Sequence, residues 1–252
     1  MNPDTLYLAL AFFAVATLYS SVGFGGGSSY LALLALSLAA DTALMRSTAL
    51  LCNLAVVSGN VILHARAGHV LWRRFAPFAL LSVPAAFLGA TLPVSRERFF
   101  WLLGGTLVAA AVLLAWRTLR AHRGAAFAAK AYAPWTGPAL GGGIGLLSGV
   151  VGIGGGIFLA PVLHHLRWSG SLQVAALASL FILANSVAGL AGLATVGDLR
   201  LDATITPLCL FAVVLGGQLG ARWGVRSFSP SAIRLVTAVL VGAVGLRILL
   251  SS

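Results

Sequence analysis

Charged side chains are scarce in this chain of 252 residues, of which only 8% are Asp, Glu, Lys or Arg. A soluble domain carries roughly 25% charged residues, because its surface faces water. The sparse charge and the 60% hydrophobic content therefore exclude an ordinary water-soluble globule. One helical crossing of a bilayer core takes roughly 20 apolar residues. We predict an all-α, polytopic integral membrane protein with about eight transmembrane helices.

Acidic residues are scarcer still, with five in the chain against 16 Lys and Arg. They are Asp4, Asp41, Glu97, Asp198 and Asp202, and all lie in expected termini or loops. Transporters of protons and metal ions commonly use carboxylates within the membrane, so their absence there disfavours a cation substrate. A net charge of +11 would indicate nucleic acid in a soluble protein. Here the basic residues are scattered between apolar runs, so we expect no nucleic-acid partner.

Signatures of catalysis and of metal binding are missing as well. The sequence has no Gly-x-Ser-x-Gly, no His-Glu-x-x-His and no Walker loop. Cys52 and Cys209 lie in apolar runs without a Cys-x-x-Cys spacing, which is typical of buried thiols. No basic region precedes the first apolar run, so we do not expect a cleaved signal peptide. We predict no enzyme activity, no cofactor and no metal site.

Uncharged stretches divide the chain into eight expected segments. They cover approximately 5–40, 47–63, 75–92, 99–116, 134–163, 172–196, 203–221 and 233–250. The tryptophans fall at or just beyond segment ends, at Trp72, Trp101, Trp116, Trp135, Trp168 and Trp223. Tryptophan is enriched at membrane–water interfaces, which supports these boundaries.

The first and fifth segments are too long for one perpendicular crossing. Residues 5–40 hold 36 residues without charge, about 54 Å as a continuous helix. Each segment contains a glycine cluster, the first with Gly23, Gly25, Gly26 and Gly27 and the second with Gly152, Gly154, Gly155 and Gly156. Glycine inside a helix costs about 1 kcal/mol relative to alanine, so we predict that both helices are broken. If either segment dips into the membrane and returns, the helix count and orientation change.

The two clusters belong to an internal repeat. Gly152 follows Gly23 by 129 positions, and Ser179 and Asn185 follow Ser47 and Asn53 by 132. We predict two tandem transmembrane repeats, at 1–120 and 134–252, joined by a basic linker at 121–133. The basic residues of the linker favour a cytoplasmic position for it. With eight crossings, both termini would then lie in the cytoplasm too. The total charges of alternate loops barely differ, so the topology stays open.

A broken helix in a membrane exposes backbone N–H groups that need partners. Broken segments at corresponding positions of two repeats indicate a transporter's substrate site, and the partial positive charge of a half-helix N-terminus favours an anion. We predict that substrate binds at the eight cluster glycines together with Ser47, Asn53, Ser179 and Asn185. The alternative is that the glycines only pack helices and the asparagines bond neighbouring helices. Arg46 we interpret as snorkelling to the interface.

The stretch from Ser148 to Leu163, SGVVGIGGGIFLAPVL, resembles the glycine-rich signature of the TauE/SafE family. The first-half stretch from Ser21 to Gly27, SVGFGGG, is similar, although Pro161 has Ala32 as its equivalent. The family comprises small bacterial permeases described as sulfite or organosulfonate exporters. The resemblance implies a secondary transporter in the cell (inner) membrane that exports a small anionic solute.

Several alternatives stay open from the residues alone. The cargo of a transporter could be a cation or a neutral organic solute. The chain could also be a channel, or a membrane scaffold that transports nothing. Contact with membrane lipid is expected in every case, and a homo-oligomer is compatible with each of them.

Overall fold

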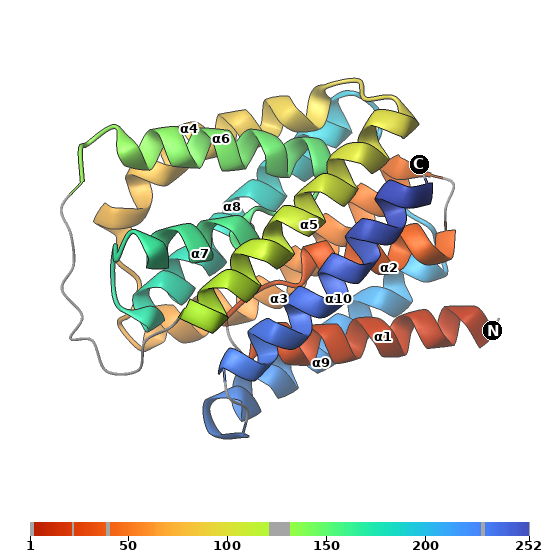
Figure 1. Ribbon diagram of the computed structural model, residues 1–252. Coiled ribbons are helices and arrows are strands. Elements are labelled where there is room, and N and C mark those ends of the chain that lie inside the picture. Colours follow the sequence, from red (N-terminus) through yellow and green to blue (C-terminus); the bar gives the residue numbers. More distant parts are fainter. Residues whose placement is uncertain (1–2, 22, 39–40, 121–131, 228–229, 252) are drawn as a thin grey trace.

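The computed structural model describes residues 3–21, 23–38, 41–120, 132–227 and 230–251, which form ten α-helices and no strand (Figure 1). The helices are α1 (Pro3–Ser20), α2 (Gly27–Leu38), α3 (Thr42–Arg66), α4 (Trp72–Thr91), α5 (Arg96–Arg120), α6 (Thr136–Val151), α7 (Gly156–His165), α8 (Ser171–Thr195), α9 (Ile205–Ser227) and α10 (Pro230–Ser251). The all-α prediction is confirmed. Of the predicted linker, residues 121–131 lie outside the described residues.

Five of the described helices, α3, α4, α5, α8 and α9, are long and apolar enough to cross a membrane. The others are apolar too but shorter over their described parts. Length and composition thus fit a polytopic membrane protein, while the predicted number of eight crossings stays a prediction.

Both helices predicted to break are interrupted at the glycine clusters. The first ends at Ser20 and resumes at Gly27, and the second ends at Val151 and resumes at Gly156. Gly23 and Gly26 have φ angles of +82° and +89°, and Gly152, Gly154 and Gly155 have φ angles between +81° and +86°. Side chains other than glycine are strained in this left-handed region. The interruption is therefore confirmed, and its cause is the backbone conformation that the glycines allow.

The chain reverses direction at each interruption. The rings of Phe12 and Tyr30 stack with their centroids 4.7 Å apart, whereas 18 residues of continuous helix would separate them by about 27 Å. Likewise, a Cβ added at Gly155 would lie 3.1 Å from Cγ2 of Ile144, which precedes it in α6. The α1–α2 and α6–α7 pairs are therefore helical hairpins, as in the re-entrant alternative.

These reversals place the start of α1 and the end of α10 at one end of the bundle, and the end of α5 and the start of α6 at the other. In Figure 1 both termini lie at the right, while α5 ends and α6 begins at the left. We call these the terminal end and the linker end. The expectation that both termini share the linker's side is wrong, because each hairpin adds one reversal. α2 and α7, with 12 and 10 residues, measure about 18 and 15 Å, roughly half of a bilayer core.

Each hairpin packs against the other half of the chain through glycines outside the two clusters. A Cβ added at Gly141, Gly145 or Gly149 of α6 would lie 2.1 to 2.5 Å from a carbonyl oxygen of α4. Gly216 and Gly220 of α9 approach carbonyl oxygens of α1 in the same way, at 2.4 and 2.1 Å. The packing role considered as an alternative for the glycine clusters is thus clearly present in these five residues.

Replacing Gly145 with alanine is expected to destabilise the fold by about 1–3 kcal/mol, because the new methyl group overlaps α4. The Cβ would lie 2.5 Å from the carbonyl oxygen of Ser82. Gly143 is the matched control, since a Cβ there meets nothing within 4 Å. Unfolding of both variants in detergent measures the difference. Equal stability of the Gly145→Ala and Gly143→Ala variants would contradict the tight α4–α6 contact.

Candidate functional site

α3 and α8 run antiparallel between the two hairpins. At the terminal end, the N–H of Arg200, just beyond α8, donates to Oγ of Ser47 in the first turns of α3 (3.1 Å). Toward the linker end, a Cβ added at Gly23 would lie 3.1 Å from Ala175 of α8 and 3.3 Å from His64 of α3. The start of each helix therefore lies at the end of the other, and their middles meet where the hairpins turn.

Asn53 of α3 lies at this meeting point, between the two glycine turns. Its side chain is fully buried, and its Nδ2 donates to the carbonyl oxygen of Ile153 (3.0 Å). A Cβ added at Gly27 or Gly154 would lie 2.1 or 2.8 Å from Nδ2, and one at Gly25 would lie 2.5 Å from Oδ1. Glycines of both turns thus provide the space that the amide occupies.

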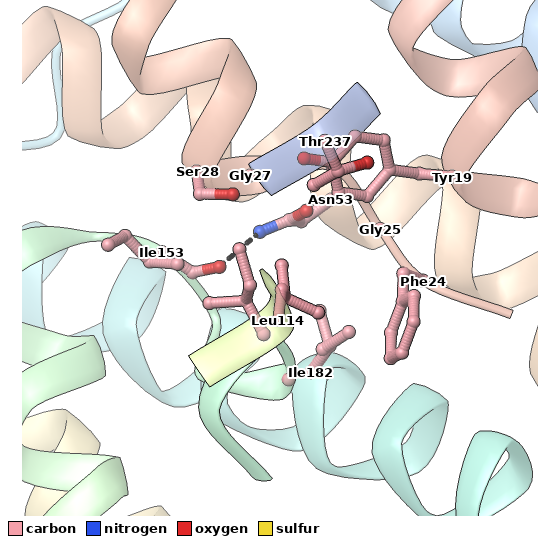
Figure 2. A pocket seen from close by; sticks show the side chains of 13 residues that line it. Tyr19, Phe24, Gly25, Gly27, Ser28, Asn53, Leu114, Ile153, Ile182 and Thr237 are labelled. Atoms are coloured by element: carbon pink, nitrogen blue, oxygen red, sulfur yellow. Dashed lines mark hydrogen bonds between the residues drawn. The ribbon is translucent and has the colours of Figure 1, made fainter. Parts of the chain in front are cut away.

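A small cavity opens beside Asn53 (Figure 2). It is lined by Tyr19, Phe24, Gly25, Gly26, Gly27, Ser28, Asn53, Leu114, Ile153, Gly156, Ile157, Ile182 and Thr237. Its volume of about 20 Å³ holds about one water molecule. Both half-length helices begin at this cavity, α2 with Gly27 and α7 with Gly156.

The electrostatic character of the cavity follows from these helix starts. The first N–H groups of a helix have no partner within it and carry a partial positive charge, and no side chain caps α7 at Gly155. None of the residues that line the cavity is acidic. Instead, Asp202 caps α9 in the α8–α9 loop, where N–H groups of Ile205 and Thr204 lower the pKa of its carboxyl.

Unpartnered polar atoms gather around the second turn. Oδ1 of Asn53, Oγ of Ser148 and Oγ of Ser186 are buried and have no hydrogen-bond partner among the described residues. A Cβ at Gly154 would lie 3.2 Å from Oγ of Ser186, and one at Gly155 would lie 3.3 Å from Cβ of Ser148. A buried polar group without a partner costs about 1–3 kcal/mol, so this region favours a polar guest.

The structure brings some of the predicted site residues together and separates others. Five of them line the cavity: Gly25, Gly26, Gly27, Gly156 and Asn53. Gly154 and Gly155 lie in the adjacent turn, while Gly23, Gly152, Ser47, Ser179 and Asn185 do not line the cavity.

The two repeated serine and asparagine pairs play unequal parts. Ser179 holds the first turn, since its Oγ donates to the carbonyl oxygen of Gly23 (2.7 Å). Ser47 instead bonds the α8–α9 loop. Asn185 is buried, and neither polar atom of its amide has a partner within the described chain. Identical spacing in the sequence therefore does not give identical surroundings.

Three polar residues of the cavity were not predicted from the sequence. Tyr19 and Ser28 flank the first glycine cluster, and the hydroxyl of Tyr19 lies 2.7 Å from Oγ of Ser29. Their proximity to the cluster was a usable signal. Thr237 comes from α10 and carries no comparable signal, since it lies in an ordinary apolar run.

Arg46 is buried and does not snorkel, so that interpretation is wrong. Only 6% of its surface is exposed, and its Nη2 donates to the carbonyl oxygens of Ala90 (3.1 Å) and Gly149 (2.9 Å). A Cβ added at Gly152 would lie 3.1 Å from its Cγ. The guanidinium joins α3, α4 and α6 beside the second turn.

Comparison with known proteins indicates a membrane transport protein. The family described as "Sulfite exporter TauE/SafE" matches residues 8–248. The chain is also similar to a "Probable membrane transporter protein y4hK" of Sinorhizobium fredii (strain NBRC 101917 / NGR234). The two are 35% identical over 249 residues, which are 99% of this chain and 100% of that protein. No solved structure matches the chain.

Proposed function

This chain belongs to the TauE/SafE family of multi-pass membrane transporters, and on that premise we propose that it exports a small anion through the cavity beside Asn53. Sulfite or an organosulfonate is the proposed cargo, and the inner cell membrane is the proposed location. The transporter is of the secondary type, with no enzyme activity or cofactor.

The observation that carries this proposal is the convergence of α2 and α7 on one cavity. Both helices begin there, at about half the bilayer's depth, and Gly27 and Gly156 line it. Two helix N-termini direct N–H groups and partial positive charge toward the same space, which favours an anion. Asn53 adds an amide donor, because its Nδ2 can turn from the carbonyl oxygen of Ile153 toward an anion.

We further propose that the two halves are inverted repeats. Helices in corresponding positions pack in corresponding pairs, α1 with α9 and α6 with α4. Gly68 and Gly197, which follow α3 and α8, share φ angles of +71° and +75°. The antiparallel α3 and α8 support an axis in the membrane plane. Eight helices of 16 or more residues would then cross, while α2 and α7 reach the midplane.

The cavity in its present size supports an occluded state. A volume of about 20 Å³ is too small for sulfite, so the halves must move apart for the anion to enter. Alternating exposure of a site between two repeats is how such transporters operate. In this proposal the hydrogen bond between Asn53 and Ile153 breaks as the cavity expands.

The alternatives make different predictions for reconstituted protein. Cation transporters commonly use a carboxylate near their site, whereas none of the cavity-lining residues is acidic. If the protein is a scaffold, no solute should cross the membrane of proteoliposomes faster than that of protein-free liposomes. We expect sulfite efflux from loaded proteoliposomes to exceed that from protein-free liposomes, while matched cations show no difference. Cation flux alone would overturn the proposed anion cargo.

A glycine variant separates the site from the fold. Replacing Gly25 with alanine is expected to reduce sulfite flux at least about tenfold, since a Cβ there would lie 2.5 Å from Oδ1 of Asn53 and small displacements at a site are costly. Gly105→Ala is the control, because nothing lies within 4 Å of a Cβ there. Full flux in a folded Gly25→Ala variant would count against this cavity as the site.

A further inference from the structure

A second cavity, of about 520 Å³, lies between α3 and α9 toward the linker end. Its lining includes the polar side chains of Asn60 and Gln218 and, on the last turns of the two helices, Arg66 and Arg222. Polar side chains at this depth of a membrane protein occur where they face protein or water. The space is large enough for a hydrated anion.

The two arginines give this cavity a positive mouth. The one ion pair in the described part of the chain joins Arg200 and Asp41 at the terminal end, so neither Arg66 nor Arg222 is neutralised by a carboxylate. Both are exposed. Charge of one sign around a low-dielectric cleft raises the local concentration of ions of the opposite sign by about 10-fold or more.

One layer of hydrogen-bonded side chains separates this cavity from the central one. Oγ of Ser20 donates to Oδ1 of Asn60 (2.9 Å) and lies 2.8 Å from the carbonyl oxygen of Gly217. Nδ2 of Asn60 in turn faces the carbonyl oxygen of Phe24 (3.5 Å), and Phe24 lines the central cavity. Breaking these hydrogen bonds would connect the two spaces.

The corresponding path toward the terminal end is closed. There α8 packs tightly on α4, with a Cβ at Gly192 placed 2.6 Å from the carbonyl oxygen of Phe87. The guanidinium of Arg46 also ties α3 to α4 and α6 through Ala90 and Gly149. Of these two paths, only the one toward the linker end therefore holds a cavity, and the hydrogen bonds of Ser20 and Asn60 still close it off from the central site.

The distribution of charge favours a cytoplasmic position for the linker end. In the described part of the chain, nine arginines lie at the linker end, on the last turns of α3, α5 and α9, on α4 and α10 near their starts, and between α7 and α8. Five lie toward the terminal end together with all five acidic residues. Cytoplasmic ends of membrane helices carry the excess of Lys and Arg. The sequence alone indicated nearly equal charge on the two sides of the membrane, because that count of crossings left out the chain reversals at the two hairpins.

We propose that the α3–α9 cavity is the cytoplasmic vestibule through which the anion reaches the central site, with Arg66 and Arg222 selecting for negative charge. This inference rests on the proposed anion transport. It adds the route by which the anion reaches the central site, the side of the membrane from which it enters, and the residues that select for negative charge. Ser20 and Asn60 form the gate between vestibule and site. The occupant is a free hydrated anion and not the headgroup of an anionic lipid.

Thiol labelling tests the vestibule without requiring transport. In a Cys52→Ala, Cys209→Ala background, Gly59→Cys places a thiol in the vestibule, where its Cβ meets only Nε2 of Gln218 at 3.4 Å. We expect it to react with membrane-impermeant thiosulfonate reagents in inside-out vesicles and not in right-side-out vesicles. Leu80→Cys is the control, because that exposed side chain lies near the middle of α4 and faces lipid.

The charge of the reagent tests the arginines. We compare the labelling rate of the Gly59→Cys thiol with an anionic reagent to its rate with a cationic reagent. This ratio should fall at least about tenfold when Arg66→Glu and Arg222→Glu are introduced. Reaction from the outside only would overturn the orientation. Labelling only by a lipid-soluble reagent, or protection by added anionic lipid but not by sulfite, would assign the groove to lipid. If the vestibule thiol is labelled as expected but proteoliposomes show no sulfite flux, the vestibule is supported and the proposed sulfite transport is refuted.

Discussion

Replacing Asn53 with aspartate is expected to lower sulfite flux by at least about 100-fold. The two side chains have nearly the same shape, but the carboxylate brings a negative charge into the cavity where the two half-helices begin. Two like charges about 4 Å apart repel by about 4 kcal/mol at an effective dielectric constant of about 20. A loss of 1.4 kcal/mol in transition-state binding lowers a rate by about tenfold, so even partial screening leaves a large effect.

Asn53→Ala is the comparison for this experiment. Alanine removes the hydrogen bond to Ile153 without adding charge, so its flux should fall less than that of Asn53→Asp. Initial rates of sulfite efflux from proteoliposomes give the order, and melting in detergent shows whether both variants fold. Equal losses in two folded variants would indicate that the cargo does not sense charge at Asn53. Gain of cation flux in Asn53→Asp would favour the cation alternative.

Replacing Arg46 with alanine is expected to destabilise the protein by about 3 kcal/mol or more. The change removes the hydrogen bonds to the carbonyl oxygens of Ala90 and Gly149, and each bond from a charged donor contributes about 1.5–3 kcal/mol. It also leaves both oxygens without that partner in a bundle that excludes water. Unfolding in detergent with increasing denaturant measures the change.

Arg73→Ala is the matched control for Arg46. Arg73 is exposed at the start of α4, so its removal should change stability by less than about 0.5 kcal/mol. If the two variants unfold alike, the buried guanidinium does not join α3, α4 and α6 as described. Stability of the Arg46→Ala variant within error of the wild type would likewise contradict the geometry.

The sequence located the helix interruptions because their cause is local. Four glycines within five residues disfavour a helix wherever the chain places them, and α1 and α6 both end beside such a cluster. The direction of the chain after Gly26 depends instead on contacts such as that of Phe12 with Tyr30. Those contacts form only after packing, so a bent span and a hairpin were indistinguishable beforehand.

The candidate site was predictable in part for the same reason. The cavity is lined by hairpin glycines that the clusters had indicated, namely Gly25, Gly26, Gly27 and Gly156. Asn53 lines the cavity and Asn185 does not, and their equal spacing in the two repeats could not predict this difference. Arg46 shows the limit most clearly. Its partners Ala90 and Gly149 lie 44 and 103 positions away in the chain, so neither belongs to its local sequence.

The packing of α1 on α9 has a consequence for synthesis. Ser20 bonds the carbonyl oxygen of Gly217, 197 positions later in the chain, and α1 rests on glycines of the same late helix. The face of α1 that packs on α9 therefore stays uncovered until almost the whole polypeptide has been synthesised. Contacts between such distant segments form slowly. Tyr19 and Gly25 line the cavity beside this late contact, so the cavity is completed near the end of folding, and chains truncated before α9 should lack it.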